Sequence, residues 1–198
     1  MEETTPLYGL VLAGGKSNRM GRDKGLITYH ELPQREHLYR LLQPLCNRVF
    51  LSVRTEQVAD LDSETDYIVD EDLYRGPFNG LLSAHRRYPE VAWLALACDL
   101  PLMETTGLQR LIAARDPSKV ATAYATKQSG LPEPLAAIWE SRGLQQAELH
   151  MKTATSSCPR KFLINSDIEL VEAMQDELLA NANNPEEYLI IREKLSLL

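Results

Sequence analysis

Four basic side chains gather in a short segment directly after a glycine turn. An apolar stretch ends at Ala13-Gly14-Gly15, and the next nine residues hold four bases against one acid, a net charge of +3. The bases are Lys16, Arg19, Arg22 and Lys24. The chain as a whole carries −7 over 198 residues. Because glycine lets backbone N–H groups approach phosphate oxygens, which the bases then neutralise, this pattern predicts a polyphosphate site.

The glycine turn matches neither of two common nucleotide-binding motifs. It is not the G-x-G-x-x-G of nicotinamide-binding proteins, and it is not the G-x-x-x-x-G-K-[ST] of P-loop NTPases. The alternative interpretation is a tight strand-to-helix turn with solvated bases. The density of bases on an acidic chain favours phosphate binding over that alternative.

Asp99 is the second residue that could do chemistry. Residues 92–97 contain no polar side chain and predict a central strand that is buried on both faces. Asp99 comes directly after this strand, and Pro101 would stiffen the turn that aims it. Such a carboxylate either caps a helix or holds a hard cation such as Mg²⁺. Since the next helix is expected near Glu104, five residues on, we favour Mg²⁺ ligation.

Two further groups give weaker indications. Asp70 ends a short apolar stretch and is followed by the turn Gly76-Pro77, which could form the wall of a nucleotide pocket or a plain loop. Asn184 before Pro185 predicts a helix start. Asn181 and Asn183 are not explained by that helix start and are candidates to face a ligand.

Alternating strands and helices are expected to position these residues. Strands are predicted at 8–12, 48–53, 67–69, 92–97, 120–124 and 135–139. Helices are predicted at 36–45, 78–88, 104–114 and 185–194. This alternation indicates an α/β protein with a three-layer, doubly wound, mostly parallel sheet. Ligands bind beyond the carboxyl ends of such strands, which selects the loops after Leu12, Val69 and Ala97.

Composition narrows the class of protein. The length suits one domain, residues 1–198, and the pI of about 5.2 argues against a general nucleic-acid binder. Three cysteines without a C-x-x-C pair are typical of a reducing compartment. The longest apolar run has eight residues, too short for a membrane span, and the start Met-Glu-Glu is not that of a signal peptide. We therefore expect a cytoplasmic protein without a membrane or nucleic-acid partner.

Taken together, these motifs resemble the MobA-type family of molybdenum cofactor guanylyltransferases. The segment Leu12-Ala-Gly-Gly-Lys-Ser-x-Arg-Met-Gly-x-Asp-Lys24 is similar to the family's nucleotide-binding signature. The other similar segments are Asp70 with Gly76-Pro77, Cys98-Asp99-Leu-Pro101, Glu133-Pro134-Leu135 and Asn181-x-Asn183-x-Pro-Glu. The chain departs from the family pattern at Ser52, where asparagine is frequent, and at Phe78-Asn79, where Leu-Ala is commoner.

The resemblance implies a Rossmann-like nucleotide-binding half, of the nucleotide-diphospho-sugar transferase type, and GMP transfer from GTP·Mg²⁺ to a molybdenum-loaded pterin phosphate. It implies that the amides of Ala13, Gly14 and Gly15 cradle the triphosphate, and that Leu12, Ala13 and Asp70 line the guanosine side. Lys24, Arg19 and Asp99 would be catalytic, with Mg²⁺ on Asp99. Pro134, Asn181 and Asn183 would contact the pterin substrate. Molybdenum-insertion proteins and molybdoenzyme chaperones are candidate partners.

Two alternatives stay open at the level of sequence. One is a related cytidylyltransferase or sugar-phosphate nucleotidylyltransferase, although Leu-Ala-Gly-Gly rather than Leu-Ala-Ala-Gly favours guanine. The other is a non-catalytic nucleotide-sensing module, which would need neither Lys24 nor Asp99.

Overall fold

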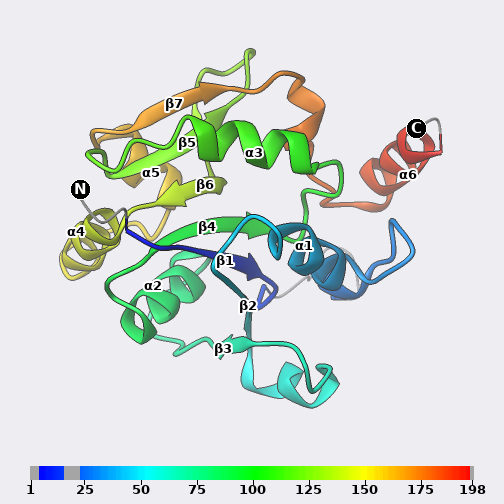
Figure 1. Cartoon of the computed structure of the whole chain (residues 1–198), viewed down its shortest axis with the longest axis horizontal. Coiled ribbons are helices and arrows are strands. Elements are labelled where there is room, and N and C mark those ends of the chain that lie inside the picture. Colours follow the sequence, from blue (N-terminus) through cyan, green and yellow to red (C-terminus); the bar gives the residue numbers. More distant parts are fainter. Residues whose placement is uncertain (1–4, 16–22, 197–198) are drawn as a thin grey trace.

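A mixed sheet of seven strands forms the centre of the part of the protein that is described (Figure 1). The structure is a computed structural model that describes residues 5–15 and 23–196. The strands are β1 (Leu7–Leu12), β2 (Arg48–Val53), β3 (Tyr67–Val69), β4 (Ala92–Ala97), β5 (Ala121–Ala125), β6 (Pro132–Trp139) and β7 (Glu169–Glu172). Their order across the sheet is β3-β2-β1-β4-β6-β5-β7. All neighbours pair in parallel except β6, which is antiparallel to both β4 and β5.

Helices cover both faces of this sheet. The α-helices are α1 (Gln34–Leu42), α2 (Phe78–Arg87), α3 (Thr105–Ala113), α4 (Ser141–Met151), α5 (Pro159–Ile164) and α6 (Pro185–Leu195). The described ranges also contain three short 3-10 helices, η1 (Lys24–Leu26), η2 (Thr55–Asp60) and η3 (Asp176–Leu179). One core cluster joins α1 and α3 to the sheet, and a second joins α2, α4 and α5 to the opposite face. The predicted three-layer α/β class is thereby confirmed.

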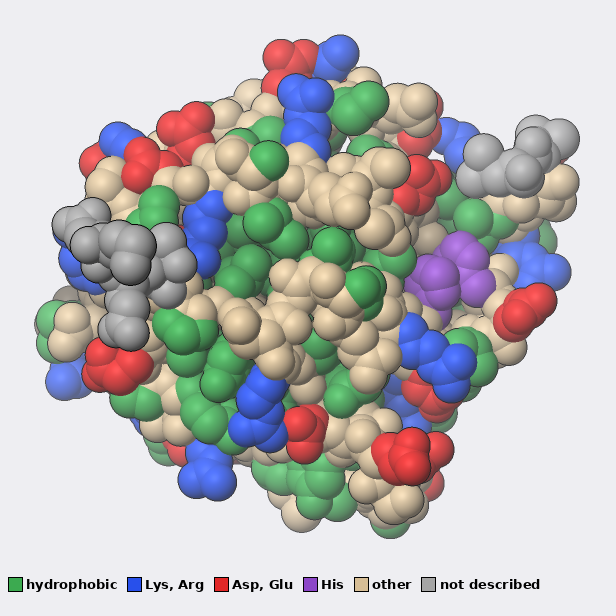
Figure 2. Space-filling model, in the orientation of Figure 1, with side chains coloured by type: hydrophobic (Ala, Val, Ile, Leu, Met, Phe, Trp, Pro, Cys, Tyr) green, Lys and Arg blue, Asp and Glu red, His purple; other side chains and the backbone are tan. Residues whose placement is uncertain are grey.

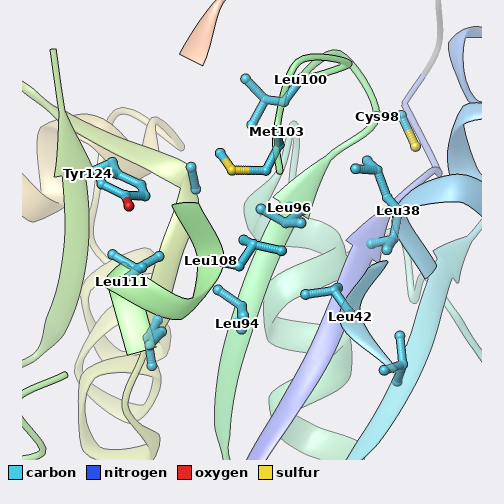
Figure 3. Close-up of a cluster of buried hydrophobic side chains, with 14 of the residues drawn as sticks. Leu38, Leu42, Leu94, Leu96, Cys98, Leu100, Met103, Leu108, Leu111 and Tyr124 are labelled. Atoms are coloured by element: carbon cyan, nitrogen blue, oxygen red, sulfur yellow. The ribbon is translucent and has the colours of Figure 1, made fainter. Parts of the chain in front are cut away.

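Strand β4 lies at the middle of both clusters because it carries apolar side chains on both faces. Leu94 and Leu96 belong to the cluster under α1 and α3, whereas Trp93 and Ala95 belong to the other. Figure 3 shows the leucines of α1 and α3 approaching Leu94 and Leu96 from two sides. All six residues of β4 are buried, as the apolar run predicted. This burial fixes the carboxyl end of β4, and therefore Asp99, relative to β1.

Most expected elements occur within a few residues of the predicted bounds. Strands β2, β3 and β4 coincide with the prediction, and α6 begins at Pro185 as expected. The Asn184 side chain caps α6 by accepting from the Glu187 N–H at 2.9 Å. Strand β7 and helices α4 and α5 were not predicted. Strand β7 has four residues, of which Val171 is the buried one, and α5 has six, so both are too short to give a clear period. Helix α4 buries Leu144 and Ala147 at helical spacing, and sequence reasoning missed that signal.

Helix α6 packs against the segment after η1 and against the loop that follows β4. Its Ile191 joins a small buried cluster with Ile27, Tyr29 and Leu102. The loop that follows β4 is thus covered by the C-terminal helix. In Figure 1 this helix, in red, lies at the margin of the sheet and helix layers.

The surface carries both signs of charge. Acidic and basic side chains are interspersed over the face shown in Figure 2. Cys46, Cys98 and Cys158 form no disulfide. Among the described helices, none has the length and apolar character that a membrane span requires.

Candidate nucleotide-binding site

A cavity of about 620 Å³ opens at the carboxyl ends of four parallel strands, β1 to β4. Its wall includes the glycine turn after β1, Ser52 and Arg54 at the end of β2, Asp70 after β3 and Asp99 after β4. The chain runs from β1 to β2 on one side, and β4 lies on the other side of β1. This is the switch point at which doubly wound sheets bind ligands. The volume is within the range of small-molecule sites.

The glycine turn approaches its neighbours closely at one of its two glycines. The Ala13 N–H donates to the Ser52 carbonyl at 2.9 Å and extends the β1–β2 ladder by one residue. A Cβ on Gly14 would lie 2.3 Å from Oδ2 of Asp70, so no larger residue fits without displacing that carboxylate. A Cβ on Gly15 would meet nothing within 4 Å. Gly14 is therefore required by contact with Asp70.

Lys24 lies where three distant segments meet. Its Nζ donates to Oδ1 of Asn183 at 2.6 Å and lies 3.4 Å from Oδ2 of Asp99. The Lys24 and Asp99 side chains are 22% and 24% exposed, so a ligand in the pocket can reach both. Asp23 caps η1 by accepting from the Gly25 N–H at 2.9 Å, and this cap sets the direction of Lys24. The structure thus brings together Lys24, Asp99 and Asn183.

Asp99 stands apart from the helix that it could have capped. The N-cap of α3 is Glu104, and Asp99 instead accepts through its backbone carbonyl from the Ala182 N–H at 3.0 Å. Within the described ranges, no group of three or more His, Cys, Asp or Glu residues could hold a metal. Mg²⁺ in phosphoryl-transfer sites needs only one or two carboxylates together with substrate phosphates. One partly exposed carboxylate in the pocket fits that requirement.

Asp70 accepts a hydrogen bond from Ser52, the residue at which the chain first departs from the family pattern. The Ser52 hydroxyl donates to Oδ1 of Asp70 at 2.6 Å. Burial raises the pKa of Asp70 from 3.8 to about 6, against the lowering effect of the Ser52 hydrogen bond. A Cβ on Gly80 of α2 would lie 2.3 Å from the Ser52 Oγ. Ser52 therefore fills the space between Asp70 and the start of α2.

The second departure from the family pattern, Phe78-Asn79, ties a loop to α2. The Asn79 Oδ1 accepts from the Tyr74 N–H at 3.2 Å, and its Nδ2 donates to Asp72 at 3.4 Å. Asp72 and Gly76 both have a positive φ, of 54° and 71°. Phe78 is buried against Trp139 and Phe162. This loop forms the rim of the pocket beside Asp70.

Three predicted site residues, Arg19, Pro134 and Asn181, are not among the described residues that line the pocket. Arg19 lies outside the described residues, as do Lys16 and Arg22. Pro134 is buried in β6 and its carbonyl accepts from the Trp139 Nε1 at 2.9 Å, whereas its neighbour Leu135 lines the pocket. Asn181 is exposed and is not among the described residues that line the pocket. The pterin contacts expected of Pro134 and Asn181 stay predictions.

Sequence reasoning missed the segment after β2. Arg54 donates through Nη1 to the carbonyls of Gly14 at 2.5 Å and Gly15 at 3.1 Å. The Gln57 Nε2 donates to the Ala13 carbonyl at 3.0 Å and to Oδ2 of Asp23 at 2.6 Å. The signal was available, since β2 is a fourth parallel strand whose carboxyl end borders the same edge.

The sheet is mostly parallel, and a pocket with charged side chains lies at the carboxyl ends of its strands beside a glycine turn. This arrangement defines an α/β protein of the doubly wound, ligand-binding class. The model of the MobA-like NTP transferase domain matches residues 9–188. The chain belongs to the MobA-like NTP transferase domain family, which confirms the family expected from the motifs.

Similarity to curated relatives extends over nearly the whole chain. It is 34% identical over 190 residues to a molybdenum cofactor guanylyltransferase of Pseudomonas aeruginosa, covering 91% of this chain and 92% of that protein. It is 41% identical over 187 residues to a molybdenum cofactor biosynthesis bifunctional protein of Synechocystis, covering 93% of this chain. The matched part spans about half of that bifunctional protein, 53% of its length.

A solved structure shows the same fold. Molybdopterin-guanine dinucleotide biosynthesis protein A from Archaeoglobus fulgidus superposes with a TM-score of 0.79. The two sequences are 19% identical, and the match covers 96% of this chain and all of the other.

Proposed function

We propose that this protein transfers GMP from GTP to the phosphate monoester of a molybdenum-loaded pterin, with release of pyrophosphate. The observation that carries the proposal is the meeting of Lys24, Asp99 and the Gly14–Gly15 turn at one pocket. The chain that forms this pocket is similar over nearly its full length to a molybdenum cofactor guanylyltransferase. The cytoplasm, with its reducing conditions, is the compartment we propose.

The reaction needs charge neutralisation and alignment more than a protein nucleophile. A phosphate oxygen of the pterin attacks the α-phosphorus of GTP and forms a new P–O bond. The bond between the α-phosphorus and the bridging oxygen breaks, and pyrophosphate leaves with the electron pair. Two polyanions must approach each other in line, so fixed positive groups account for most of the catalysis.

The residues of the pocket can supply these groups. In the proposed complex the N–H groups of the glycine turn would bind the triphosphate, and Lys24 would bridge the α-phosphate and the incoming phosphate. Asn183 holds the ammonium of Lys24 in place at 2.6 Å. Leu12, Ala13 and Asp70 line the guanosine side. Arg19, which is outside the described residues, is proposed to neutralise the leaving pyrophosphate.

Mg²⁺ is the cofactor we propose, and Asp99 is the residue that would hold it. When bound, it would neutralise charge on the phosphates of GTP. Asp99 and Lys24 lie 3.4 Å apart and both line the pocket. Proteins that insert molybdenum, and chaperones of molybdoenzymes, stay predicted partners.

Pyrophosphate release tests the proposal. The protein is incubated with the pterin substrate, Mg²⁺ and either GTP, CTP or UTP. The proposal predicts release with GTP and a guanine dinucleotide product. Release with CTP in preference to GTP would indicate a cytidylyltransferase instead. Binding of GTP without any release would indicate a nucleotide-sensing module.

A further inference from the structure

We propose that Arg54 and Gln57 are positioning residues that turn two backbone N–H groups of the glycine turn toward the phosphates. The inference rests on the proposed function, because it assumes that a nucleotide triphosphate occupies this pocket. Neither side chain was expected from the sequence to take part in the site. Both lie just after β2, and each donates hydrogen bonds to carbonyl groups of the turn.

Both the nitrogen and the oxygen of the Gln57 side-chain amide form hydrogen bonds. Its Nε2 donates to the carbonyl of Ala13 and to the carboxylate of Asp23, and its Oε1 accepts from the Arg54 N–H at 2.8 Å. The side chain is buried, with 4% of its surface exposed. A buried amide with three hydrogen bonds is held in one orientation, because each lost bond would leave a buried polar group unsatisfied.

Arg54 holds the next peptide group along the turn. Its Nη1 donates to the carbonyls of Gly14 and Gly15, and its Nε donates to Glu56 at 2.7 Å. The ion pair with Glu56 orients the guanidinium from the solvent side. Arg54 therefore binds backbone oxygens of the turn through a fixed, planar group.

These contacts determine where the N–H groups of the turn point. In a planar trans peptide the carbonyl and the following N–H point in opposite directions. The Ala13 carbonyl and the Gly14 N–H belong to one peptide group. Because Gln57 of η2 binds the carbonyl, the N–H points away from η2. Arg54 does the same for the Gly15 N–H by fixing the Gly14 carbonyl. Along a strand successive carbonyls alternate, whereas here two successive carbonyls face the same segment.

The two N–H groups that result are available to a ligand. Neither the Gly14 nor the Gly15 N–H has an acceptor within residues 5–15 and 23–196. Both glycines line the pocket. Successive N–H groups that point to one side form the concave arrangement that binds anions. The turn can thus bind phosphate oxygens without first reorganising its backbone, which increases affinity.

Gln57 also connects the turn to Lys24. The Asp23 carboxylate accepts from Gln57 through Oδ2 and from the Gly25 N–H through Oδ1. One side chain therefore contacts Ala13, which precedes the basic segment, and Asp23, the next-to-last residue of that segment. Loss of the Gln57 donor is expected to disturb both the N–H groups and Lys24, and so to change both KM for GTP and kcat.

Two conservative variants test this inference through binding. Gln57→Glu keeps the size and the acceptor of the side chain but replaces the donor with an oxygen that repels Asp23. Arg54→Lys keeps the charge but not the planar group. Gln145→Glu, on the exposed side of α4, and Arg48→Lys, at the start of β2, are the matched controls. Affinities for GTP and for guanosine are measured by calorimetry and competition, after thermal unfolding confirms folding.

We expect the dissociation constant for GTP to rise by about tenfold in each variant, as for the loss of a hydrogen bond beside charge. The constant for guanosine, which has no phosphates, should change less than about threefold, and the controls should match wild type. If Gln57→Glu does not fold, Arg54→Lys carries the test alone.

Two results would contradict the inference. Folded variants could keep wild-type affinity for GTP, which in Arg54→Lys would show that Arg54 acts by charge alone. The variants could instead lose affinity for GTP and for guanosine in equal proportion, as a general structural defect would cause. Failure of the wild-type protein to bind GTP would contradict the proposed function, and with it the inference.

Discussion

The Nζ of Lys24 donates a 2.6 Å hydrogen bond to the amide oxygen of Asn183, across 159 positions of sequence. The same ammonium lies 3.4 Å from Asp99. The ammonium of Lys24, at the end of the basic segment, therefore contacts two other segments. These are the loop after β4 and the loop before α6. Holding a lysine by two partners reduces the rotamer freedom that it would otherwise lose on binding substrate.

Lys24→Ala should lower turnover by about 10²–10³, the usual effect of removing one preorganised charge contact from a transition state. The reason is that the alanine leaves the α-phosphate without its cation. Steady-state pyrophosphate release measures the effect. Lys119→Ala, which removes a surface pair with Asp167, is the control and should keep full activity. Near-normal turnover in Lys24→Ala would exclude the proposed role.

Asp99→Asn should weaken the dependence of activity on Mg²⁺, because a neutral amide is a poor ligand for a hard cation. The concentration of Mg²⁺ at half-maximal activity is expected to rise by about tenfold or more, the cost of one charged contact. Asp167→Asn removes an exposed carboxylate and serves as the control. An unchanged Mg²⁺ titration in Asp99→Asn would refute metal binding by this residue.

Asp70 should make stability depend on pH. Its folded-state pKa of about 6 is above the ordinary value of 3.8, so the folded state binds the proton more tightly. The stabilising contribution is complete below pH 3.8 and is lost as pH rises through about 6. Relative to Asp70→Asn, wild-type protein should lose about 3 kcal/mol of unfolding free energy over that range.

Denaturant unfolding between pH 3.5 and 7.5 measures this difference. Subtracting the variant removes the contributions of other titrating groups that the two proteins share. Ser52→Ala should move the transition to still higher pH, since the hydroxyl favours the ionised carboxylate. Parallel stability curves for wild type and Asp70→Asn would show that the pKa of Asp70 is not raised.

Two glycines in helices should respond in opposite directions to alanine. A Cβ at position 80 would lie 2.3 Å from the Ser52 Oγ and 2.7 Å from Leu12, so Gly80→Ala should destabilise by about 1–3 kcal/mol. At Gly107 the nearest atom would be 3.4 Å away, and Gly107→Ala should stabilise by up to about 1 kcal/mol. Thermal unfolding of both variants measures the change in stability. Equal changes in the two variants would contradict the packing described around Ser52.

The strongest sequence patterns predicted the centre of the fold. Strand β4 contains only apolar residues, as a strand covered on both faces requires. This apolar run can be recognised in the sequence alone. Strand β7 is short, borders the sheet and has Glu169 and Glu172 at its ends, so it gives no comparable pattern. The antiparallel direction of β6 depends on pairing with β4 and β5, which local sequence does not encode.

Site residues in loops directly after a strand could be predicted from the sequence. Contacts between segments that are distant in the sequence could not. The loops after β1, β3 and β4 were identified by the rule for parallel sheets. The contact between Lys24 and Asn183 required the path of the C-terminal loop. Gln57 belongs to a polar segment that reads as solvated, and only the folded chain shows that its amide is buried against Ala13.

A crystal structure with a non-hydrolysable GTP analogue and Mg²⁺ tests the account most directly. We predict phosphate oxygens within hydrogen-bond distance of the Gly14 and Gly15 N–H groups and of the Lys24 ammonium, with the metal ion on Asp99. Phosphates bound elsewhere, with the glycine turn and Lys24 facing solvent, would contradict the account.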